Sequence, residues 1–415
     1  MDEDQVNEWM QKASEDEELK SFLQLSDLNF SFLLKIGDET YLWHIHKEEI
    51  SVTRKLTLDH VWDFTISIPG SAWSKYLQKV APPFHNTLQA MVAHVPGVSI
   101  EGNRLVWAQS IRIVERLLLS AKEETESLAA KLTEEKFSPE TIKGHYVKMY
   151  VNGEEHVTYY EEAGEGQPII FLHTAGSDSR QYKYLLGNKT LQKKWRMIAF
   201  DLPYHGKSSP PDKFWEKPYK LTTKLYTEWI LGFLKAADLY DKKPVISGSS
   251  MGGAIVLHLA ARYGELFRAV VSMEGGFGRE GRRVNWTNHL QVHGGHFLSS
   301  WVNGLMSPES PEYFRRLVLW EYAQGGPGVY QGDTYFYSYD WPKQAQGIGK
   351  TQCPLWIFCG EYDYSCTPEQ SEEAANRMDG TFIKMEGMGH FPPSENPAGL
   401  LKYVQPVLDE ILEKH

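Results

Sequence analysis

A serine, a histidine and an aspartate lie in the second half of the chain, in contexts that suit nucleophilic catalysis. Ser250 is the centre of Gly248-Ser249-Ser250-Met251-Gly252, a G-x-S-x-G pentapeptide between a strand-like and a helix-like apolar run. A serine on such a strand–turn–helix corner is exposed on a tight turn. Its hydroxyl becomes a nucleophile only when an imidazole accepts the proton and a carboxylate orients that imidazole. We therefore predict that Ser250 acts with a histidine and an acid from later in the chain.

The expected acid and base follow Ser250 in the order that this turn requires. Asp363 comes after the apolar run 354–359, and His390 lies in Gly387-Met-Gly-His-Phe391, between the last predicted strand and the final helix. We predict that His390 is the base and that Asp363 orients it. Glu361 and Glu274 are competing carboxylates, and Asp363 is favoured by its position in the loop.

Two further loops give the chain from about residue 145 to 415 a family resemblance. His173-Thr-Ala-Gly176 and Asp201-Leu-Pro-Tyr-His-Gly-Lys-Ser208 resemble the His-Gly loop and the Asp-x-x-Gly-His-Gly-x-Ser loop of α/β-hydrolases, with Tyr204 in place of the first glycine. The resemblance implies an α/β fold, with a mostly parallel sheet and helices on both faces. It also implies an oxyanion hole, for which the amides of Ala175 and Met251 are our candidates. Thr174, which replaces the usual glycine, is a third.

The segment from about 276 to 350 occupies the place of the variable cap in that family. It is rich in aromatic residues, which suit a bulky apolar or aromatic substrate. We expect most of these side chains to form the core of the cap and two or three to reach the ligand. The candidates for substrate binding are Trp301, Tyr322, Tyr330, Tyr337 and His296.

Residues 1–125 predict a separate, smaller α+β domain. Apolar and polar residues alternate around 41–46 and 63–68, and 104–121 has the apolar stripe of an amphipathic helix. The order of these elements over about 20–121 resembles the sterol-carrier-protein-type lipid-binding domain, which implies an apolar cavity. The alternative is a small module for dimer contacts or for shielding the active-site mouth. Residues 126–144 predict a charged helical linker, and 145–415 the catalytic domain.

Composition excludes several classes of protein. A net charge of −11 over 415 residues argues against a nucleic-acid-binding surface, and 41% hydrophobic residues argue against a disordered chain. The odd number of cysteines, the acidic N-terminus and the absence of a long apolar run predict a cytoplasmic protein without a membrane span. A small-molecule substrate and a homodimer are the expected partners.

No cofactor or metal is expected, because a serine triad needs neither. His289, His293 and His296 have a spacing that one helix face could use for a metal, but Gly294-Gly295 would break that helix. The segment also lacks the glutamate of a zinc-hydrolase motif.

Three functions fit these residues. The first is a serine hydrolase that cleaves a carboxylic ester, lactone or amide through an acyl-enzyme. The second is a hydrolase of carbon–carbon bonds that uses the same three residues. The third is a non-catalytic small-molecule binder on the hydrolase fold, against which the intact Ser250, Asp363 and His390 argue.

Overall fold

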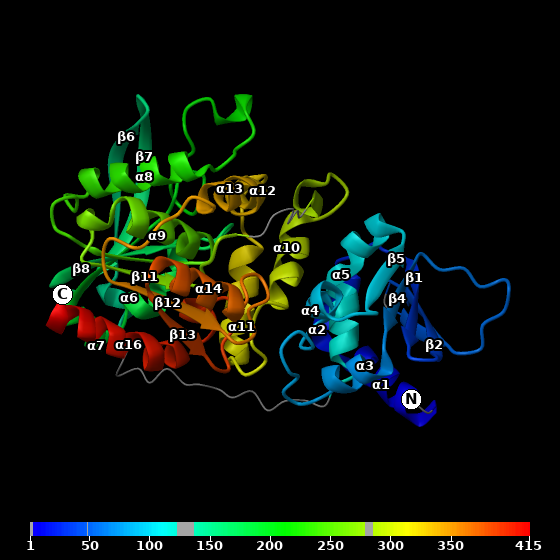
Figure 1. The fold of residues 1–415 in the computed structure, drawn as a ribbon. Helices are drawn as coiled ribbons and strands as arrows, with labels where there is room; N and C mark the ends of the chain where they lie inside the picture. Colours follow the sequence, from blue (N-terminus) through cyan, green and yellow to red (C-terminus); the bar gives the residue numbers. More distant parts are fainter. Residues whose placement is uncertain (1–2, 48, 123–136, 279–284) are drawn as a thin grey trace. The chain divides into compact units, whose positions relative to one another are not determined.

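The structure is a computed structural model that describes residues 3–47, 49–122, 137–278 and 285–415 (Figure 1). The chain forms two compact units that are not consecutive in sequence. The first contains Met1–Ser127 and His289–Gly304, and the second contains Leu128–Asn288 and Leu305–His415. Among the described residues, none of the helices combines the length and the apolar character needed to cross a membrane.

The first unit is built on a five-stranded sheet in the order β3-β2-β1-β4-β5. Strand β4 runs parallel to β1, and the other neighbouring pairs are antiparallel. In β4 the burial alternates along Phe-Thr-Ile-Ser-Ile, which is the period-2 pattern expected of a sheet with one buried face. The strands are β1 (Phe30–Ile36), β2 (Glu39–His46), β3 (Glu49–Thr53), β4 (Phe64–Ile68) and β5 (Ser99–Gly102).

Helices and aromatic rings complete this unit. The rings of Trp9, Trp43 and Trp73 pack on one another, with centroids 4.7 and 5.6 Å from that of Trp9. Asn103 caps the longest helix, α5, by accepting a hydrogen bond from the Val106 amide. The helices are α1 (Glu3–Glu15), α2 (Glu17–Gln24), α3 (Gly70–Tyr76), α4 (Leu88–His94) and α5 (Arg104–Leu119).

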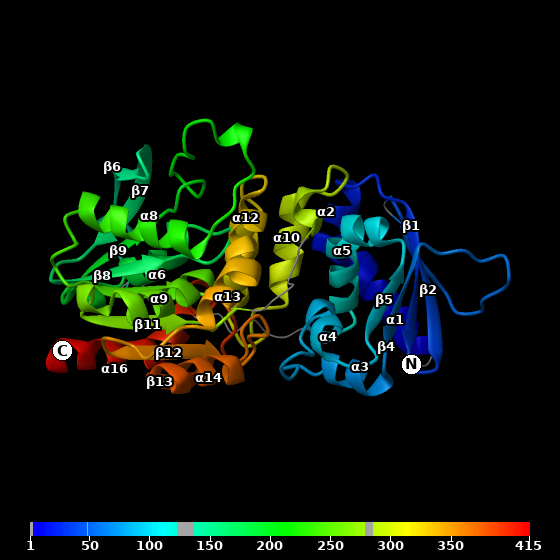
Figure 2. The same cartoon turned by 45° about the horizontal axis from the view of Figure 1, so that its top comes forward.

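A helix from the predicted cap also belongs to the first unit. Helix α10 (Gly294–Asn303) packs beside α5, as both views show (Figures 1 and 2). The Gln109 side-chain amide donates to the carbonyl of Gln291 at 2.8 Å, and that of Asn86 donates to the carbonyl of Gly304 at 2.9 Å. The insertion expected as one cap over 276–350 is therefore divided between the two units.

The second unit is organised around an eight-stranded sheet in the order β13-β12-β11-β10-β8-β9-β7-β6. All neighbouring strands from β13 to β9 are parallel, and the hairpin β6–β7 adds an antiparallel edge. The strands are β6 (Lys143–Val151), β7 (Glu154–Ala163), β8 (Gln167–Leu172), β9 (Trp195–Phe200), β10 (Val245–Ser249), β11 (Ala269–Met273), β12 (Leu355–Gly360) and β13 (Thr381–Met385).

Helices cover both faces of this sheet, so its central strands β10, β11 and β12 are buried along their whole length. One core contains Ile170 and Ile246 with residues of α8 (Thr223–Ala236), α9 (Met251–Arg262) and α14 (Pro368–Met378). The other contains Ile169 and Val245 with residues of α6 (Lys183–Leu186), α7 (Lys189–Gln192) and α16 (Pro397–Lys414). Figure 1 shows α8 and α16 on opposite sides of the sheet. The mostly parallel sheet with helices on both faces confirms the predicted α/β fold class.

The rest of the insertion stays with the second unit. It contributes α11 (Glu312–Tyr322), α12 (Val329–Tyr335) and α13 (Trp341–Ala345) between β11 and β12, and α15 (Pro392–Glu395) follows β13. Residues 126–136 of the predicted linker lie outside the described residues. Its remainder is not an α-helix, because Pro139–Thr141 form a single 3₁₀ turn and β6 begins at Lys143.

The division of the insertion predicts that the catalytic half cannot stand alone. In residues 140–415 expressed by themselves, α10 loses the helix on which it packs, and its buried apolar side chains become exposed. Exposing a buried Leu or Phe costs about 1.5–3 kcal/mol. We expect this fragment to aggregate or to unfold at a lower temperature than the full chain, as measured by light scattering and thermal unfolding. Co-expression of residues 1–122 should restore solubility. A well-behaved fragment with the parent's oligomeric state, unfolding temperature and turnover would contradict this prediction.

Candidate active site

Ser250 stands at the corner between β10 and α9 in a backbone conformation that few non-glycine residues adopt. Its φ is 56° and its ψ is −112°. The amide of Ser250 donates a hydrogen bond to the carbonyl of Met273 on the neighbouring strand at 2.8 Å. A Cβ on Gly248 would lie 2.3 Å from the backbone of Gly252, and one on Gly252 would lie 2.4 Å from the Leu172 carbonyl oxygen. The two glycines of the motif are therefore required by close backbone contacts on each side of Ser250.

The structure brings Ser250, His390 and Asp363 into one hydrogen-bonded row. The Nε2 atom of His390 lies 2.8 Å from the Oγ atom of Ser250, and its Nδ1 atom lies 2.6 Å from Oδ2 of Asp363. All three residues are buried, and Asp363 is completely inaccessible to solvent. With the proton on Nδ1 bonded to Asp363, Nε2 is free to accept the serine proton.

The other carboxylate oxygen of Asp363 is fixed by the backbone. It accepts hydrogen bonds from the amides of Ser365 at 2.7 Å and Cys366 at 3.1 Å. Glu361, the competing acid two residues earlier, accepts instead from the amide of Gly387 at 3.1 Å and lies 3.7 Å from the Lys384 ammonium group. The β12–α14 loop therefore presents Asp363 to the imidazole.

Glu274, the other competing carboxyl, lies beside Asp363 at the end of β11. Both of its oxygens are 3.0 Å from the amide nitrogen of Gly360, and its side chain is completely buried. Burial, followed by the charge of Asp363 and a hydrogen bond to it, raises the pKa of Glu274 well above the usual range. A neutral Glu274 can donate its proton to Asp363, and the two carboxyls then share one negative charge.

This corner is also where the described residues come nearest to a metal-ligand set. Ligand atoms of Glu274, Cys359 and Asp363 lie within 4.8 Å of one another. However, Asp363 is bonded to His390, and burial raises the pKa of the Cys359 thiol well above its usual value. The side chains of Glu274, Cys359 and Asp363 are therefore better suited to share a proton than to bind a metal cation. Of the three spaced histidines, His293 caps α10 through its Nδ1 atom, which accepts from the His296 amide at 3.2 Å.

The loop that carries His390 is held by the insertion and by a buried acid. The His390 amide donates to the Leu305 carbonyl at 2.9 Å, and the Gly389 amide donates to the carboxyl group of Glu395. A Cβ on Gly389 would lie 2.5 Å from the Leu305 oxygen, so the loop passes very close to the insertion. Burial raises the pKa of Glu395 to about 8.

Two backbone amides are available to an oxyanion. Among the described residues, the amides of Ala175 and Met251 have no hydrogen-bond acceptor, as expected for Met251 at the start of a helix. The Thr174 amide is in a different state, because it donates to the side-chain oxygen of Gln181 at 3.0 Å. The geometry therefore favours the amides of Ala175 and Met251 as oxyanion donors. The Thr174 amide is already bonded to Gln181.

The predicted substrate-binding residues are distributed over both units. Tyr322 on α11 has its hydroxyl 2.5 Å from the Thr174 hydroxyl, and the ring of Tyr330 on α12 packs on Gly176. The hydroxyl of Tyr337 donates to the carbonyl of Ser365 at 3.3 Å, in the loop that carries Asp363. Trp301 and His296 lie on α10 and belong to the first unit. The second unit by itself thus brings Tyr322 and Tyr330 to residues 173–176, here called the oxyanion loop, and Tyr337 to the β12–α14 loop that carries Asp363.

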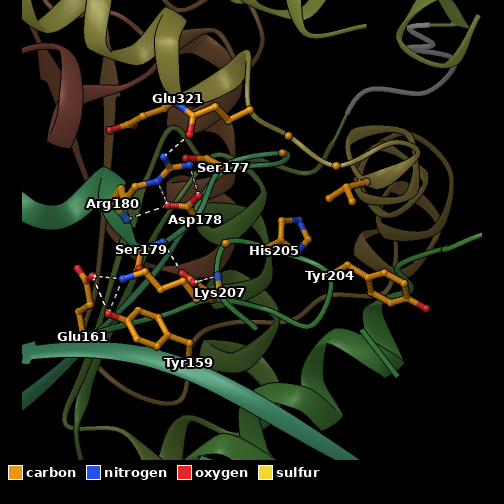
Figure 3. Close-up of a pocket in the computed structure, with 17 residues that line it drawn as sticks. Tyr159, Glu161, Ser177, Asp178, Ser179, Arg180, Tyr204, His205, Lys207 and Glu321 are labelled. Atoms are coloured by element: carbon orange, nitrogen blue, oxygen red, sulfur yellow. Dashed lines mark hydrogen bonds and ion pairs between the residues drawn. The ribbon is translucent and has the colours of Figure 1, made fainter. Parts of the chain in front are cut away.

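A cavity of about 380 Å³ lies next to the oxyanion loop, and its walls combine charged and hydroxyl side chains with aromatic and glycine residues (Figure 3). Gly176 is one of its lining residues, but none of the three triad residues is. Two of its cationic side chains have partners, since Arg180 is paired with Asp178 at 2.6 Å and the Lys207 ammonium group donates to the Tyr159 hydroxyl at 2.9 Å. Among the charged side chains of the wall, Arg180 and Asp178 therefore compensate each other.

Comparison with known proteins gives the chain a family. A model of the alpha/beta hydrolase family matches residues 169–402. A 2-hydroxy-6-oxo-6-(2'-aminophenyl)hexa-2,4-dienoic acid hydrolase of Metapseudomonas resinovorans is 33% identical over 139 residues, which is 32% of this chain and 44% of that protein. An (E)-2-((N-methylformamido)methylene)succinate hydrolase of Acinetobacter baylyi is 21% identical over 56% of this chain and 86% of its own length. The chain thus spans less than half the length of the first relative.

Solved structures agree on the fold. A thermophilic esterase from Thermogutta terrifontis superimposes with a TM-score of 0.55 at 20% identity, covering 64% of this chain and 99% of the esterase. The enol-lactonase from Burkholderia xenovorans superimposes with a TM-score of 0.52 at 22% identity, covering 63% of this chain and 99% of the lactonase. At these identities the likeness concerns the fold alone.

The three carboxyls around His390 predict different outcomes of amide substitution. Asp363→Asn should lower kcat by roughly 10³- to 10⁴-fold, because the imidazole loses the anion that orients it. Glu361→Gln should leave kcat within about twofold, because Glu361 is bonded elsewhere. Glu274→Gln, which can still donate to Asp363, should change kcat by less than about tenfold. Near-normal turnover by Asp363→Asn would transfer the acid role to one of the other two.

The buried acid Glu395 predicts a specific dependence of stability on pH. Its pKa is about 8 in the folded chain and near 4.5 when unfolded, so the folded state holds the proton more tightly. The stabilisation from this group is therefore complete below pH 4.5 and is lost as the pH rises towards 8. Glu395→Gln should remove this contribution, worth at most about 5 kcal/mol. Denaturant unfolding at pH 5 and pH 8 tests this, and parallel pH profiles for the two proteins would refute it.

Proposed function

The chain belongs to the alpha/beta hydrolase family, and we propose that it is a serine hydrolase in which Ser250 attacks a carboxylic ester, lactone or amide. One observation carries the proposal. The His390 ring lies between the Ser250 hydroxyl at 2.8 Å and the Asp363 carboxylate at 2.6 Å, in a buried row. Nucleophile, base and orienting anion are thus already within reacting distance.

The proposed reaction follows from this geometry. As Ser250 Oγ attacks the carbonyl carbon, His390 Nε2 takes its proton, and the amides of Ala175 and Met251 stabilise the negative charge that forms on the carbonyl oxygen. His390 then gives the proton to the leaving alcohol or amine, which leaves an acyl group on Ser250. A water molecule deprotonated by the same nitrogen attacks the acyl-enzyme, and the proton returns to Ser250 as the acid leaves.

The substrate class is proposed from the residues next to the oxyanion loop. Tyr322 and Tyr330 come from the insertion and contact Thr174 and Gly176, so an acyl group bound there would meet aromatic rings. This supports a bulky apolar or aromatic acyl group. Tyr337, Trp301 and His296 are the remaining candidates for substrate contacts.

A second candidate is a carbon–carbon bond hydrolase with the same three residues. The observation that favours it is the similarity to the 2-hydroxy-6-oxo-6-(2'-aminophenyl)hexa-2,4-dienoic acid hydrolase. That named compound carries an enol and a ketone but neither an ester nor an amide. We give the ester or amide reaction priority because the geometry described above provides a nucleophile, and it needs no activating ketone in the substrate.

For the first unit we propose a structural role, in which its helix α5 packs against α10 of the insertion, rather than lipid binding. The interior of this unit contains the buried, mutually tilted rings of Trp9, Trp43 and Trp73, which fill space that an apolar ligand would need. The unit also supplies the helix against which α10 packs. A cytoplasmic location is proposed from the three cysteines, all of which are free thiols.

The proposed function predicts labelling of one serine. A fluorophosphonate probe should label the wild-type chain and not Ser250→Ala, whereas Ser249→Ala, the neighbouring buried serine, should label normally. In a panel of aryl esters, lactones and anilides, turnover should disappear in Ser250→Ala alone. Labelling that survives in Ser250→Ala removes Ser250 as the nucleophile. Turnover of a vinylogous diketone without any ester hydrolysis would establish the second candidate, and ligand binding without turnover of either class would indicate a binder.

A further inference from the structure

The Ala175 amide is aimed by hydrogen bonds to its own peptide group. The Thr174 carbonyl, which belongs to the same peptide plane as the Ala175 N–H, accepts from the Ser177 amide at 3.2 Å and faces the His173 Nδ1 atom at 2.9 Å. His173 Nε2 accepts from the Leu202 amide at 3.2 Å, so its one proton is on Nδ1. In a trans peptide the N–H points away from the C=O. These bonds therefore direct the Ala175 N–H to the side opposite Thr174 O.

The next peptide group is held by an acid from the insertion. Asp333 on α12 accepts a hydrogen bond from the Gly176 amide at 2.7 Å, and the same oxygen lies 2.8 Å from Nε2 of His205. Its second oxygen accepts from the Tyr219 hydroxyl at 2.7 Å. Asp333 is completely buried, so these three donors replace its hydration.

His205 gives Asp333 a charged partner. Its Nδ1 atom lies 3.0 Å from the Pro203 carbonyl, so both ring nitrogens face oxygen acceptors and both are donors. Burial alone would lower the pKa of His205, but the Asp333 carboxylate raises it above the ordinary histidine value. Asp333 and His205 thus form a buried ion pair next to the oxyanion loop.

Close steric contacts at two glycines fix the position of α12 against the oxyanion loop. Gly176 has φ +71°, and a Cβ there would lie 2.7 Å from the ring of Tyr330 on α12. On the other side, a Cβ on Gly332 would overlap the Tyr219 ring at 2.1 Å, and the Leu221 amide donates to the Gly332 carbonyl at 3.1 Å. Helix α12 is therefore in contact with the oxyanion loop and with the segment before α8 at the same time.

We propose that Asp333 is a positioning residue that fixes the oxyanion loop, so that the Ala175 amide is correctly placed only while α12 is seated on the loop. The inference rests on the proposed function, because it assigns a partner to the proposed oxyanion hole. Stabilisation of the transition state then depends on the contact between α12 and the oxyanion loop. The sequence offered no sign of this role, because Asp333 is 157 residues from its partner Gly176.

The test is Asp333→Asn in the full chain, with an aryl ester as substrate. Asparagine keeps the shape, but it removes the charge and places an NH₂ group against donors. We expect kcat to fall about 10- to 100-fold with KM within about twofold, less than the 10²- to 10³-fold loss of a whole oxyanion donor. Affinity for phenylboronic acid, which forms a tetrahedral serine adduct, should fall by a similar factor. Affinity for the unreacted ester, measured in the Ser250→Ala background, should not change.

Tyr219→Phe is the matched control. It removes one of the three hydrogen bonds to the same carboxylate, from a residue outside the oxyanion loop, and kcat should stay within about threefold. Asp333→Glu retains the charge at a shifted position and should give an intermediate kcat with normal KM. It replaces Asp333→Asn as the test variant if the latter does not fold.

The outcomes separate this inference from the proposed function. Wild-type turnover that depends on Ser250, together with an unchanged kcat and boronate affinity in Asp333→Asn, overturns the positioning role alone. Equal losses of boronate and ester affinity, or an equal loss in Tyr219→Phe, overturn it in favour of a general structural role. A wild-type chain without Ser250-dependent turnover overturns both proposals.

Discussion

The left-handed backbone of Ser250 is the constraint on which the site depends. A φ of 56° lifts the serine out of the line of β10 and starts α9 at the next residue. The turn is possible because Gly248 and Gly252 allow backbone contacts that a Cβ atom at either position would prevent by steric clash. The Met273 carbonyl on β11 anchors the Ser250 amide, so the parallel pairing of β10 and β11 directly supports the nucleophile. Strain at this corner is retained because the surrounding sheet leaves the chain no alternative.

The insertion between β11 and β12 holds the site together from outside the sheet. Leu305 binds the His390 backbone, Tyr322 binds the Thr174 hydroxyl, and Asp333 binds the Gly176 amide. The insertion thus contacts both the loop that carries His390 and the oxyanion loop. Another part of the same insertion, α10, belongs to the first unit.

Local patterns in the sequence predicted the residues whose roles require special neighbours. The glycines around Ser250 predict its exposed turn, and the positions of Asp363 and His390 after two predicted strands predict their place beside it, where the structure has them. Asp333, His205 and Glu395 could not be assigned, because their partners are distant in sequence and their significance lies in burial and mutual contact. The membership of α10 in the first unit was equally hidden, because an amphipathic helix does not reveal which surface it packs on. The expected 276–350 cap therefore described one chain segment but not one structural body.

The central claim is that Ser250 forms a covalent acyl-enzyme. The most direct measurement is mass spectrometry of the chain after reaction with 4-nitrophenyl dimethylcarbamate, whose carbamoyl-serine product hydrolyses slowly. The account predicts the release of one equivalent of nitrophenol and one dimethylcarbamoyl group on the peptide that contains Ser250. Release of nitrophenol without an adduct, or an adduct on another residue, would contradict it.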